Sequence, residues 1–455
     1  MTVPTSPTSG VKAPLNIPMY LGKQPGAPSP KQPRQLGHQA NCDTPRPTFV
    51  LVPGNAASQL DATQDGSAGG CAPFTSPRMV YPDPSWAKNL KCLLHTLSVT
   101  YDSSSGRYSN SSGTQLYSSE GGWPNGTSTF VLQIGYAGLW HHLGSSYGYQ
   151  AGVDMFAAPY DWRLDYDGLD QAGQFDQVAA RISAAVKLNC GQKAVILAHS
   201  MGSNVVLHML RQQRFQQWRE RNIRAVIFAG ASIEGIAAMG WMIQLTGTLD
   251  ASPALTSYIP SPALAQLPPT VLDQAIYQVV QNTPFANLVL PVVGAIDEGH
   301  VLVSTPSRNY SVGQQKELLQ DMGSEVLAAL FDKVQLHTQQ LVDAGPVPGI
   351  QSFCLYSTSV RTPMTLHFSA DIPRHRAMKR PARVTWGAGD GYIDLQTLRR
   401  CSKIVQAGNV VEVAHPLVDH AGLIREPAGL AAIDSILAEI GLVKHNPKGP
   451  RGVHG

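Results

Sequence analysis

Residues 194–202 read Ala194-Val-Ile-Leu-Ala-His-Ser200-Met-Gly202, and this stretch decides the fold. Residues 194–198 form the short, continuously apolar run that is typical of a strand buried in a parallel sheet. The His-Ser-Met-Gly that follows predicts a sharp strand-to-helix turn, a nucleophile elbow, which presents the hydroxyl of Ser200 outside the sheet. The turn needs small neighbours, and Ala198 and Gly202 supply them, although glycine is the commoner residue at the first position. A serine in an ordinary strand–turn–helix connection is the alternative.

A nucleophilic serine needs a general base and a carboxylate that orients the base, and two downstream segments offer them. Residues 384–391 (VTWGAGDG) predict a short strand that ends at Asp390, and residues 410–420 (VVEVAHPLVDH) predict a strand that opens into a loop with His415 and His420. Open α/β sheets gather their ligands at the carboxyl ends of the strands. The order serine, acid, histidine favours a triad over a plain Gly-Asp-Gly turn and hydrogen-bonded loop histidines.

The composition excludes several classes of protein. A chain of 455 residues fits one large α/β domain with excursions better than several small units. Charged residues make up 14% and the formal net charge is +3, so there is no basic footprint for nucleic acid. No apolar run approaches the length of a membrane span. We expect no cofactor and no metal.

The ends of the chain differ from its middle. Residues 1–47 are rich in Pro, Ser and Gly and predict a disordered leader rather than a secretory signal, so no signal peptide is visible. Residues 443–455 predict a flexible tail, which leaves 48–442 as the folded domain.

Cysteines and sequons point to the secretory path despite the missing signal. Sequons begin at Asn110, Asn125 and Asn309. Cys71 and Cys92 enclose a loop that a disulfide would close, and Cys354 and Cys401 flank the segment that holds Asp390. Cys42 and Cys190 each precede a predicted strand, and whether they are paired or free stays open. Six reduced thiols in a cytosolic enzyme are the alternative, but we favour an oxidising compartment.

Several segments of the domain have distinct predicted roles. Residues 48–52 predict a strand followed by Pro53-Gly54-Asn55-Ala56, a loop whose backbone N–H groups can face a developing oxyanion. Residues 71–92 form the cysteine loop, and residues 93–101 predict a strand. Residues 102–129, rich in Ser, Gly and Asn, predict a mobile lid, and residues 235–345 predict a helical cap inserted between sheet strands. Trp86 and Trp123 are candidate lipid contacts.

The chain resembles the lecithin:cholesterol acyltransferase family, which includes lysosomal phospholipase A2, over roughly residues 48–442. The resemblance lies in motifs that are specific to the family: Val52-Pro-Gly54 with Gln59-Leu60-Asp61-Ala62, Ala158-Pro-Tyr-Asp-Trp-Arg163, Ala198-His-Ser-Met-Gly202, the sequon at Asn309, and the cysteine pairs Cys71 with Cys92 and Cys354 with Cys401. It implies an α/β-hydrolase fold with a mostly parallel central sheet, a helical cap and a lid loop.

The resemblance also implies the roles of individual residues. The triad is Ser200, Asp390 and His420, because Pro416 matches a proline four residues before the family's histidine and so favours His420 over His415. The oxyanion hole comes from the backbone N–H groups of Asn55 and Met201. Asp161 and Arg163 are expected to form a buried ion pair beneath the lid rather than to act in catalysis.

Three departures limit what the resemblance transfers. Ser232-Ile-Glu-Gly235 stands where relatives carry Pro-Trp-Gly-Gly, so acyl and acceptor preference do not carry over. The loop between Cys71 and Cys92 is shorter and less leucine-rich than in the lysosomal branch, which weakens the case for the same grip on a membrane. Asn55 replaces an acid of that branch, so an acidic pH optimum is not implied.

The function that the resemblance implies is a serine phospholipase A and O-acyltransferase, lumenal (lysosome or vacuole) or secreted. A fatty acyl group would pass from a glycerophospholipid through an acyl-enzyme on Ser200 to water or a lipid alcohol. A phospholipid membrane surface and a lipid acceptor are the expected partners, and the oligomeric state stays open. A neutral-lipid or carboxyl-ester hydrolase is the first alternative. A catalytically silent lipid-binding hydrolase fold is the second, and the complete set of serine, acid and histidine argues against it.

Overall fold

The structure, a computed structural model, describes residues 42, 46–67, 70–81, 83–119, 135–248 and 268–444. All of them belong to one compact unit that spans residues 38–455. Most of the predicted leader, the predicted tail from residue 445, Trp123 and Asn125 lie outside the described residues.

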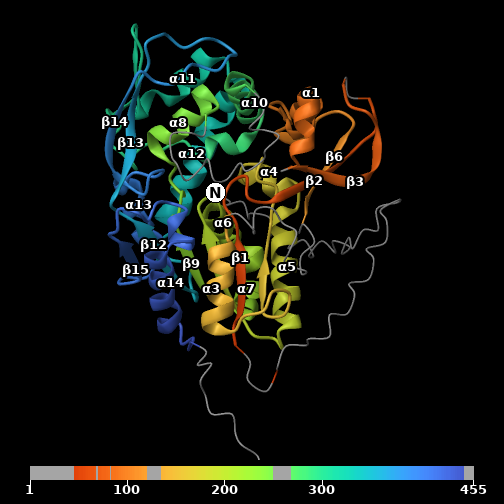
Figure 1. The fold of residues 1–455 in the computed structure, drawn as a ribbon, viewed down its shortest axis with the longest axis vertical. Helices are drawn as coiled ribbons and strands as arrows, with labels where there is room; N and C mark the ends of the chain where they lie inside the picture. The colour runs from red at the N-terminus through yellow and green to blue at the C-terminus, as the bar shows by residue number, and fades with distance from the viewer. Residues whose placement is uncertain are drawn as a thin grey trace, which may run out of the picture. The chain divides into compact units, whose positions relative to one another are not determined.

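A six-stranded sheet forms the centre of this unit (Figure 1). Its strand order is β15-β12-β9-β8-β1-β7, and every neighbouring pair is parallel. The strands are β1 (Thr48–Val52), β7 (Met155–Ala157), β8 (Ala194–His199), β9 (Ile223–Ala229), β12 (Gln351–Ser357) and β15 (Val410–Val413). Every residue of β1 and β8 is buried, which explains their continuous apolar sequences.

Helices cover the sheet and follow its strands in the order expected of an α/β-hydrolase fold. They are α3 (Ala137–Tyr147), α4 (Tyr166–Gln171), α5 (Gln174–Leu188), α6 (Gly202–Arg211), α7 (Gln216–Asn222) and α14 (Pro427–Glu439). In α5 the buried Phe175, Val178 and Ile182 recur at helical spacing and form the face that packs inward. Asp434 of α14 accepts hydrogen bonds from His142 and Tyr147 of α3, which joins these two helices.

The chain leaves the central sheet twice between β9 and β15. The first excursion contains α8 (Ala237–Thr246), α10 (Pro269–Gln281), β10 (Val301–Ser304), β11 (Asn309–Ser311), α11 (Gln315–Met322) and α12 (Glu325–Asp343). The second is the hairpin of β13 (Val360–His367) and β14 (Arg383–Gly389). Both contribute to a four-stranded sheet of order β11-β10-β13-β14. The strand before Asp390 is therefore β14 of this second sheet, not a central strand as its sequence position suggested.

A third excursion follows β1 and contains β2 (Gln59–Gln64), β3 (Phe74–Tyr81), α1 (Leu90–Leu97), β4 (Val99–Asp102), β5 (Arg107–Asn110) and β6 (Thr114–Ser119). The prediction of a strand over residues 93–101 was wrong. Leu90, Leu93, Leu94 and Leu97 recur at helical spacing, and the side chain of Asn89 caps the helix by accepting from the Cys92 N–H. The strand begins only at Val99. The predicted lid, residues 102–129, contains β5 and β6, and its residues 120–129 lie outside the described residues.

Three disulfides connect these parts. Cys71–Cys92 and Cys354–Cys401 are formed, as predicted. The pairing of Cys42 and Cys190, which the sequence left open, is a third bridge with a Cα–Cα distance of 5.8 Å. The two cysteines precede β1 and β8, which are parallel neighbours, so the segments that lead into these strands start side by side. All six cysteines are thus paired, which fits a lumenal or secreted protein. None of the helices in the described ranges is long and apolar enough to span a bilayer.

Candidate active site

The elbow at the end of β8 holds Ser200 in a strained backbone conformation. Its φ of 55° lies in the left-handed region that non-glycine residues rarely adopt. A Cβ on Gly202 would lie 2.5 Å from the carbonyl oxygen of Val52, so only glycine fits there. A Cβ on Gly54 would lie 3.0 Å from the Cβ of Ser200. The loop after β1 and the elbow are therefore in direct contact.

Asp390 and His420 form a buried couple. His420 Nδ1 lies 2.7 Å from Asp390 Oδ2, and the two residues are 6% and 0% exposed. The other carboxylate oxygen accepts from the backbone N–H groups of Tyr392 and Ile393, at 2.9 and 2.7 Å. The backbone N–H of His420 also donates to the backbone carbonyl oxygen of Asp390, at 2.7 Å. This arrangement assigns the Nδ1 proton and leaves Nε2 of His420 as the nitrogen available to a nucleophile.

Ser200 and His420 line one cavity of about 270 Å³. Its walls are mostly apolar and come from α1, α8, α10 and the ends of the central strands. They include Leu90, Leu93, Leu94 and Leu97 of α1, Ile243 of α8, and Leu272, Ala275, Ile276, Val279 and Val280 of α10. His415, by contrast, is exposed, does not line the cavity, and accepts through Nδ1 from the Leu417 N–H at 3.2 Å.

Asn55 and Met201 line the same cavity beside Ser200. Among the described residues, neither backbone N–H donates to an acceptor within the protein. The side-chain Oδ1 of Asn55 is buried and also lacks a partner there. Two unpaired N–H groups beside a serine hydroxyl form an arrangement that can stabilise an oxyanion.

A buried hydrogen-bond chain, which the sequence analysis did not predict, joins the loop after β1 to the His420 segment. The Gly54 N–H lies 2.8 Å from the Tyr136 hydroxyl, which lies 3.0 Å from His199 Nδ1. His199 Nε2 lies 3.1 Å from the His420 carbonyl oxygen. Tyr136 and His199 are 0% and 3% exposed.

The proton positions in this chain follow from its members. A carbonyl oxygen only accepts, so His199 Nε2 carries a proton and donates to His420. Burial lowers the pKa of His199 to about 3, so the ring is neutral and Nδ1 has no proton. Tyr136 therefore donates to Nδ1 and accepts from the Gly54 N–H. His199 had one signal in the sequence, its position next to Ser200, whereas Tyr136 had none.

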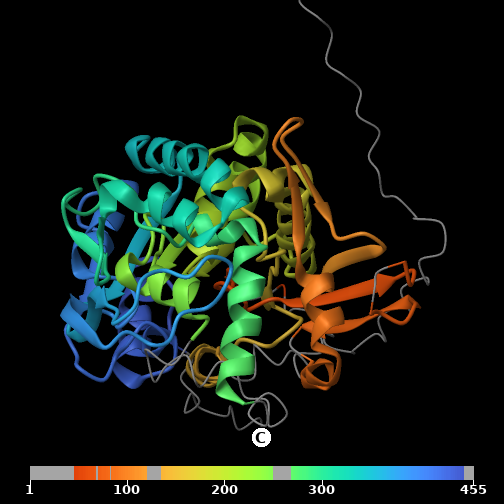
Figure 2. The ribbon, with the colours of Figure 1, turned by 90° about the horizontal axis from the view of Figure 1, so that it is seen from above.

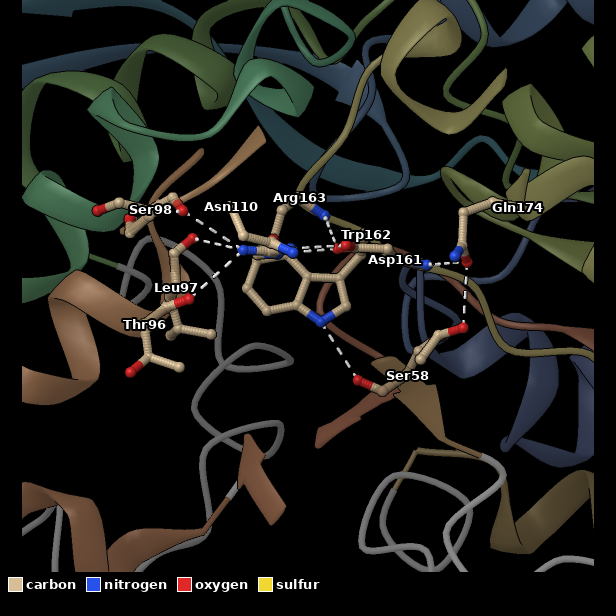
Figure 3. Close-up of polar contacts among 11 residues, drawn as sticks. Ser58, Thr96, Leu97, Ser98, Asn110, Asp161, Trp162, Arg163 and Gln174 are labelled. Carbon is tan, nitrogen blue, oxygen red and sulfur yellow. Dashed lines mark hydrogen bonds and ion pairs between the residues drawn. The ribbon is translucent and has the colours of Figure 1, made fainter. Parts of the chain in front are cut away.

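Asp161 and Arg163 form a buried ion pair in the loop after β7 (Figure 3). Arg163 Nε and Nη2 donate to the two Asp161 oxygens at 2.9 and 2.7 Å, and the arginine side chain is 1% exposed. Nη2 also donates to Asn110 Oδ1 of β5 at 2.7 Å, and Nη1 donates to the Leu97 carbonyl oxygen at 3.3 Å. The pair thus holds the end of α1, one wall of the cavity. Trp162 between them lines the cavity itself.

The loop at Ser232–Gly235, where the sequence departs from the family that it resembles, contains a second buried ion pair. Glu234 is 3% exposed, and its two carboxylate oxygens accept from Nε and Nη2 of Arg400. Arg400 begins η6 (Arg400–Ile404), which the Cys354–Cys401 disulfide ties to β12. Ser232 lines the cavity. The pair therefore fixes a cavity loop to a segment that a disulfide holds in place.

The other candidate residues of the sequence analysis lie at separate places in the fold. Trp86 is 9% exposed, packs on Phe74 and donates to the Met79 carbonyl oxygen, and it does not line the cavity. Asn110 is half-buried, whereas Asn309 is exposed on β11. No group of three or more His, Cys, Asp or Glu side chains in the described part of the chain could hold a metal ion.

Comparison with known proteins places these residues in a family. The sequence model of the family "Lecithin:cholesterol acyltransferase" matches residues 85–343, more than half of the 455 residues. The lysosomal phospholipase A and acyltransferase of Bos taurus is 25% identical over 294 residues, which cover 64% of this chain and 65% of that protein. The Homo sapiens protein of the same name is 26% identical over 293 residues, 64% of each chain. The chain thus spans slightly less than two thirds of these relatives.

Other relatives are more distant or differ in coverage. The phosphatidylcholine-sterol acyltransferase of Mus musculus is 26% identical over 354 residues, 76% of this chain and 73% of that protein. Among solved structures, the Tle4–Tli4 complex aligns with a TM-score of 0.46 and 11% identity over 87% of this chain and 99% of that chain. An alpha/beta hydrolase fold protein from Chitinophaga pinensis aligns with a TM-score of 0.23 and 11% identity over 58% and 71%.

The family match covers the elbow at Ser200 and the loop with Asp161 and Arg163, and Asp390 and His420 follow it in the chain. With more than half of its residues matched, this chain belongs to the lecithin:cholesterol acyltransferase family.

Proposed function

We propose that the protein is a serine phospholipase A and O-acyltransferase with Ser200, His420 and Asp390 as its catalytic triad. The observation that carries the proposal is the buried Asp390–His420 couple beside the cavity that also contains Ser200 on its strained turn. Membership of the family and the names of the relatives support the same activity.

The first half-reaction transfers an acyl group to the enzyme. Ser200 Oγ attacks the carbonyl carbon of a fatty ester while His420 Nε2 takes its proton, and Asp390 stabilises the imidazolium that forms. The N–H groups of Asn55 and Met201 donate to the oxyanion of the tetrahedral intermediate. The intermediate collapses, the ester C–O bond breaks, and His420 returns the proton to the departing lysophospholipid oxygen.

The second half-reaction decides between hydrolysis and transfer. Water or a lipid alcohol gives its proton to His420 and attacks the acyl-enzyme, which releases a free fatty acid or a new ester and restores Ser200. The apolar walls from α1 and α10 suit an acyl chain, and they favour an apolar alcohol over water at the acyl carbonyl. We therefore infer that both products form when an alcohol is present in the membrane.

The same observations support a proposal for the compartment. Three disulfides favour an oxidising environment, and two of the relatives carry a lysosomal name. We propose that the protein works in the lumen of a lysosome or vacuole, or outside the cell.

The test uses phosphatidylcholine vesicles with and without a long-chain alcohol, with all lipid products resolved. We expect lysophospholipid with free fatty acid in the first case, and an additional ester of the alcohol in the second. Ser200→Ala should remove all products and all labelling by a fluorophosphonate probe, with a loss of roughly 10⁶-fold in kcat. Labelling without phospholipid turnover would favour the neutral-lipid or carboxyl-ester hydrolase. If the probe does not label the folded protein, the catalytically silent lipid-binding fold is favoured.

A further inference from the structure

The loop between β13 and β14, residues 368–382, concentrates positive charge; we name it the basic loop. It contains Arg374, Arg376, Lys379 and Arg380 against one carboxylate, Asp371. Its net charge is as large as the +3 of the whole chain. The positive and negative charges of the rest of the chain therefore balance, and the loop carries a local excess of positive charge.

The basic loop is anchored on the two cap helices that form the cavity wall. The Met378 N–H donates to the Leu245 carbonyl oxygen of α8 at 2.7 Å, and the Ala377 N–H donates to Gln274 Oε1 of α10 at 3.2 Å. Met378 is 9% exposed and belongs to the core. Figure 2 shows the blue loop beside the green α10, with the orange α1 on the other side of that helix.

The charged side chains of the loop face solvent. Arg376 and Lys379 flank the anchored Ala377 and Met378, are both exposed, and make no ion pair or hydrogen bond with the described residues. Arg374 differs, since it pairs with Glu325 of α12 at 3.1 Å. The anchoring residues thus turn inward and leave at least two cations available to an external partner.

An apolar rim of the cavity lies on α10, which anchors the basic loop, and on α1 at the far side of α10 (Figure 2). Five half-buried apolar residues line the cavity: Leu90, Leu93 and Leu94 of α1, and Leu272 and Ile276 of α10. Val271, which precedes Leu272, is 40% exposed. Peripheral proteins bind an anionic bilayer through two kinds of contact: apolar side chains enter the acyl region, and cations beside them contact the lipid headgroups.

We propose that the basic loop docks the protein on an anionic phospholipid surface and so sets the cavity rim against the membrane. This inference rests on the proposed function, because an enzyme with a phospholipid substrate must bring its cavity to the bilayer surface. The occupant is a lipid surface with net negative charge, chosen because cations beside an apolar rim complement both parts of a bilayer surface.

The test measures co-sedimentation of the full chain carrying Ser200→Ala, which leaves the vesicles intact. Vesicles of phosphatidylcholine alone are compared with vesicles that also contain phosphatidylglycerol, at low and high salt. Each exposed cation near an anionic surface contributes a factor of about 5, so Arg376→Gln with Lys379→Gln should lower the partition coefficient for anionic vesicles roughly 10- to 30-fold. Binding to neutral vesicles should change little, and high salt should abolish the difference.

A matched control carries Lys187→Gln and Arg221→Gln, exposed cations on α5 and α7. It removes the same charge and should retain at least most of the binding. Equal losses in both pairs, or no preference of the parent for anionic vesicles, would overturn the proposal and leave the loop to an acidic protein partner.

Activity separates this proposal from the proposed function. In the Ser200 background, the loop variant should hydrolyse a soluble short-chain ester as fast as the parent does. Phospholipid turnover without charge-dependent docking would refute the docking surface alone. Charge-dependent docking without any phospholipid turnover would refute the proposed function alone.

Discussion

Replacing Tyr136 by phenylalanine removes one oxygen and leaves two buried polar groups without partners. The Tyr136 hydroxyl accepts from the Gly54 N–H at 2.8 Å and lies 3.0 Å from His199 Nδ1, to which it donates. Tyr136 is 0% exposed and His199 3%, so water does not reach these groups readily. Each unpaired buried group costs about 1–3 kcal/mol, and Tyr136→Phe should therefore lower the free energy of unfolding by about 2–6 kcal/mol.

The same substitution should affect turnover. Gly54 precedes Asn55, whose N–H we propose as an oxyanion donor, and His199 holds the carbonyl of His420. Loosening both should lower kcat by about 10-fold or more with little change in KM, because the losses fall on the transition state. The assays are guanidinium denaturation with the disulfides intact and initial rates on a soluble ester.

Tyr160→Phe is the matched control. Tyr160 is also 0% exposed, but its hydroxyl has no hydrogen-bond partner among the described residues. Removing that oxygen should leave stability unchanged or raise it by about 1 kcal/mol. The reasoning is refuted if Tyr136→Phe stays within about 0.5 kcal/mol of the parent, or if Tyr160→Phe is destabilised as much.

Three further outcomes are expected. His420→Ala should abolish activity, whereas His415→Ala should lose only a modest factor because His415 is exposed and outside the cavity; the reverse result in rate assays would move the base to His415. Burial raises the pKa of Asp165 to about 6, so the native state keeps a proton that the unfolded chain releases near pH 4. This contribution to stability is complete below about pH 4 and is lost as the pH rises through 6; an equally steep fall in Asp165→Asn, measured by denaturation across this range, would contradict it. Peptide mapping without reduction should find Cys42 linked to Cys190, and replacing both by serine should lower the free energy of unfolding by about 3–5 kcal/mol. Free thiols at these two positions would contradict the bridge.

The elements that were predicted correctly depend on local chemistry. The boundaries of β1 match the predicted strand at residues 48–52, and β8 extends the predicted run 194–198 by one residue, because strands buried on both faces favour continuous apolar runs. The elbow at Ser200 was visible because its turn demands small residues at fixed offsets, here Ala198 and Gly202. The error at residues 93–101 is also local, because the leucines of α1 fit a helical period that a loosely alternating interpretation overlooked.

The amino-acid sequence by itself determined the central strands, the sharp turn at Ser200, and the residue types from which a triad can be chosen. Only the tertiary structure decided which of them meet. Asp390 reaches His420 from a hairpin of the second sheet, and Cys42 meets Cys190 because β1 and β8 are neighbours. The chain from Gly54 through Tyr136 and His199 joins segments far apart in sequence. The physical reason is that backbone periodicity is written within a few residues, whereas these contacts exist only once long-range packing has excluded water and set the strand order.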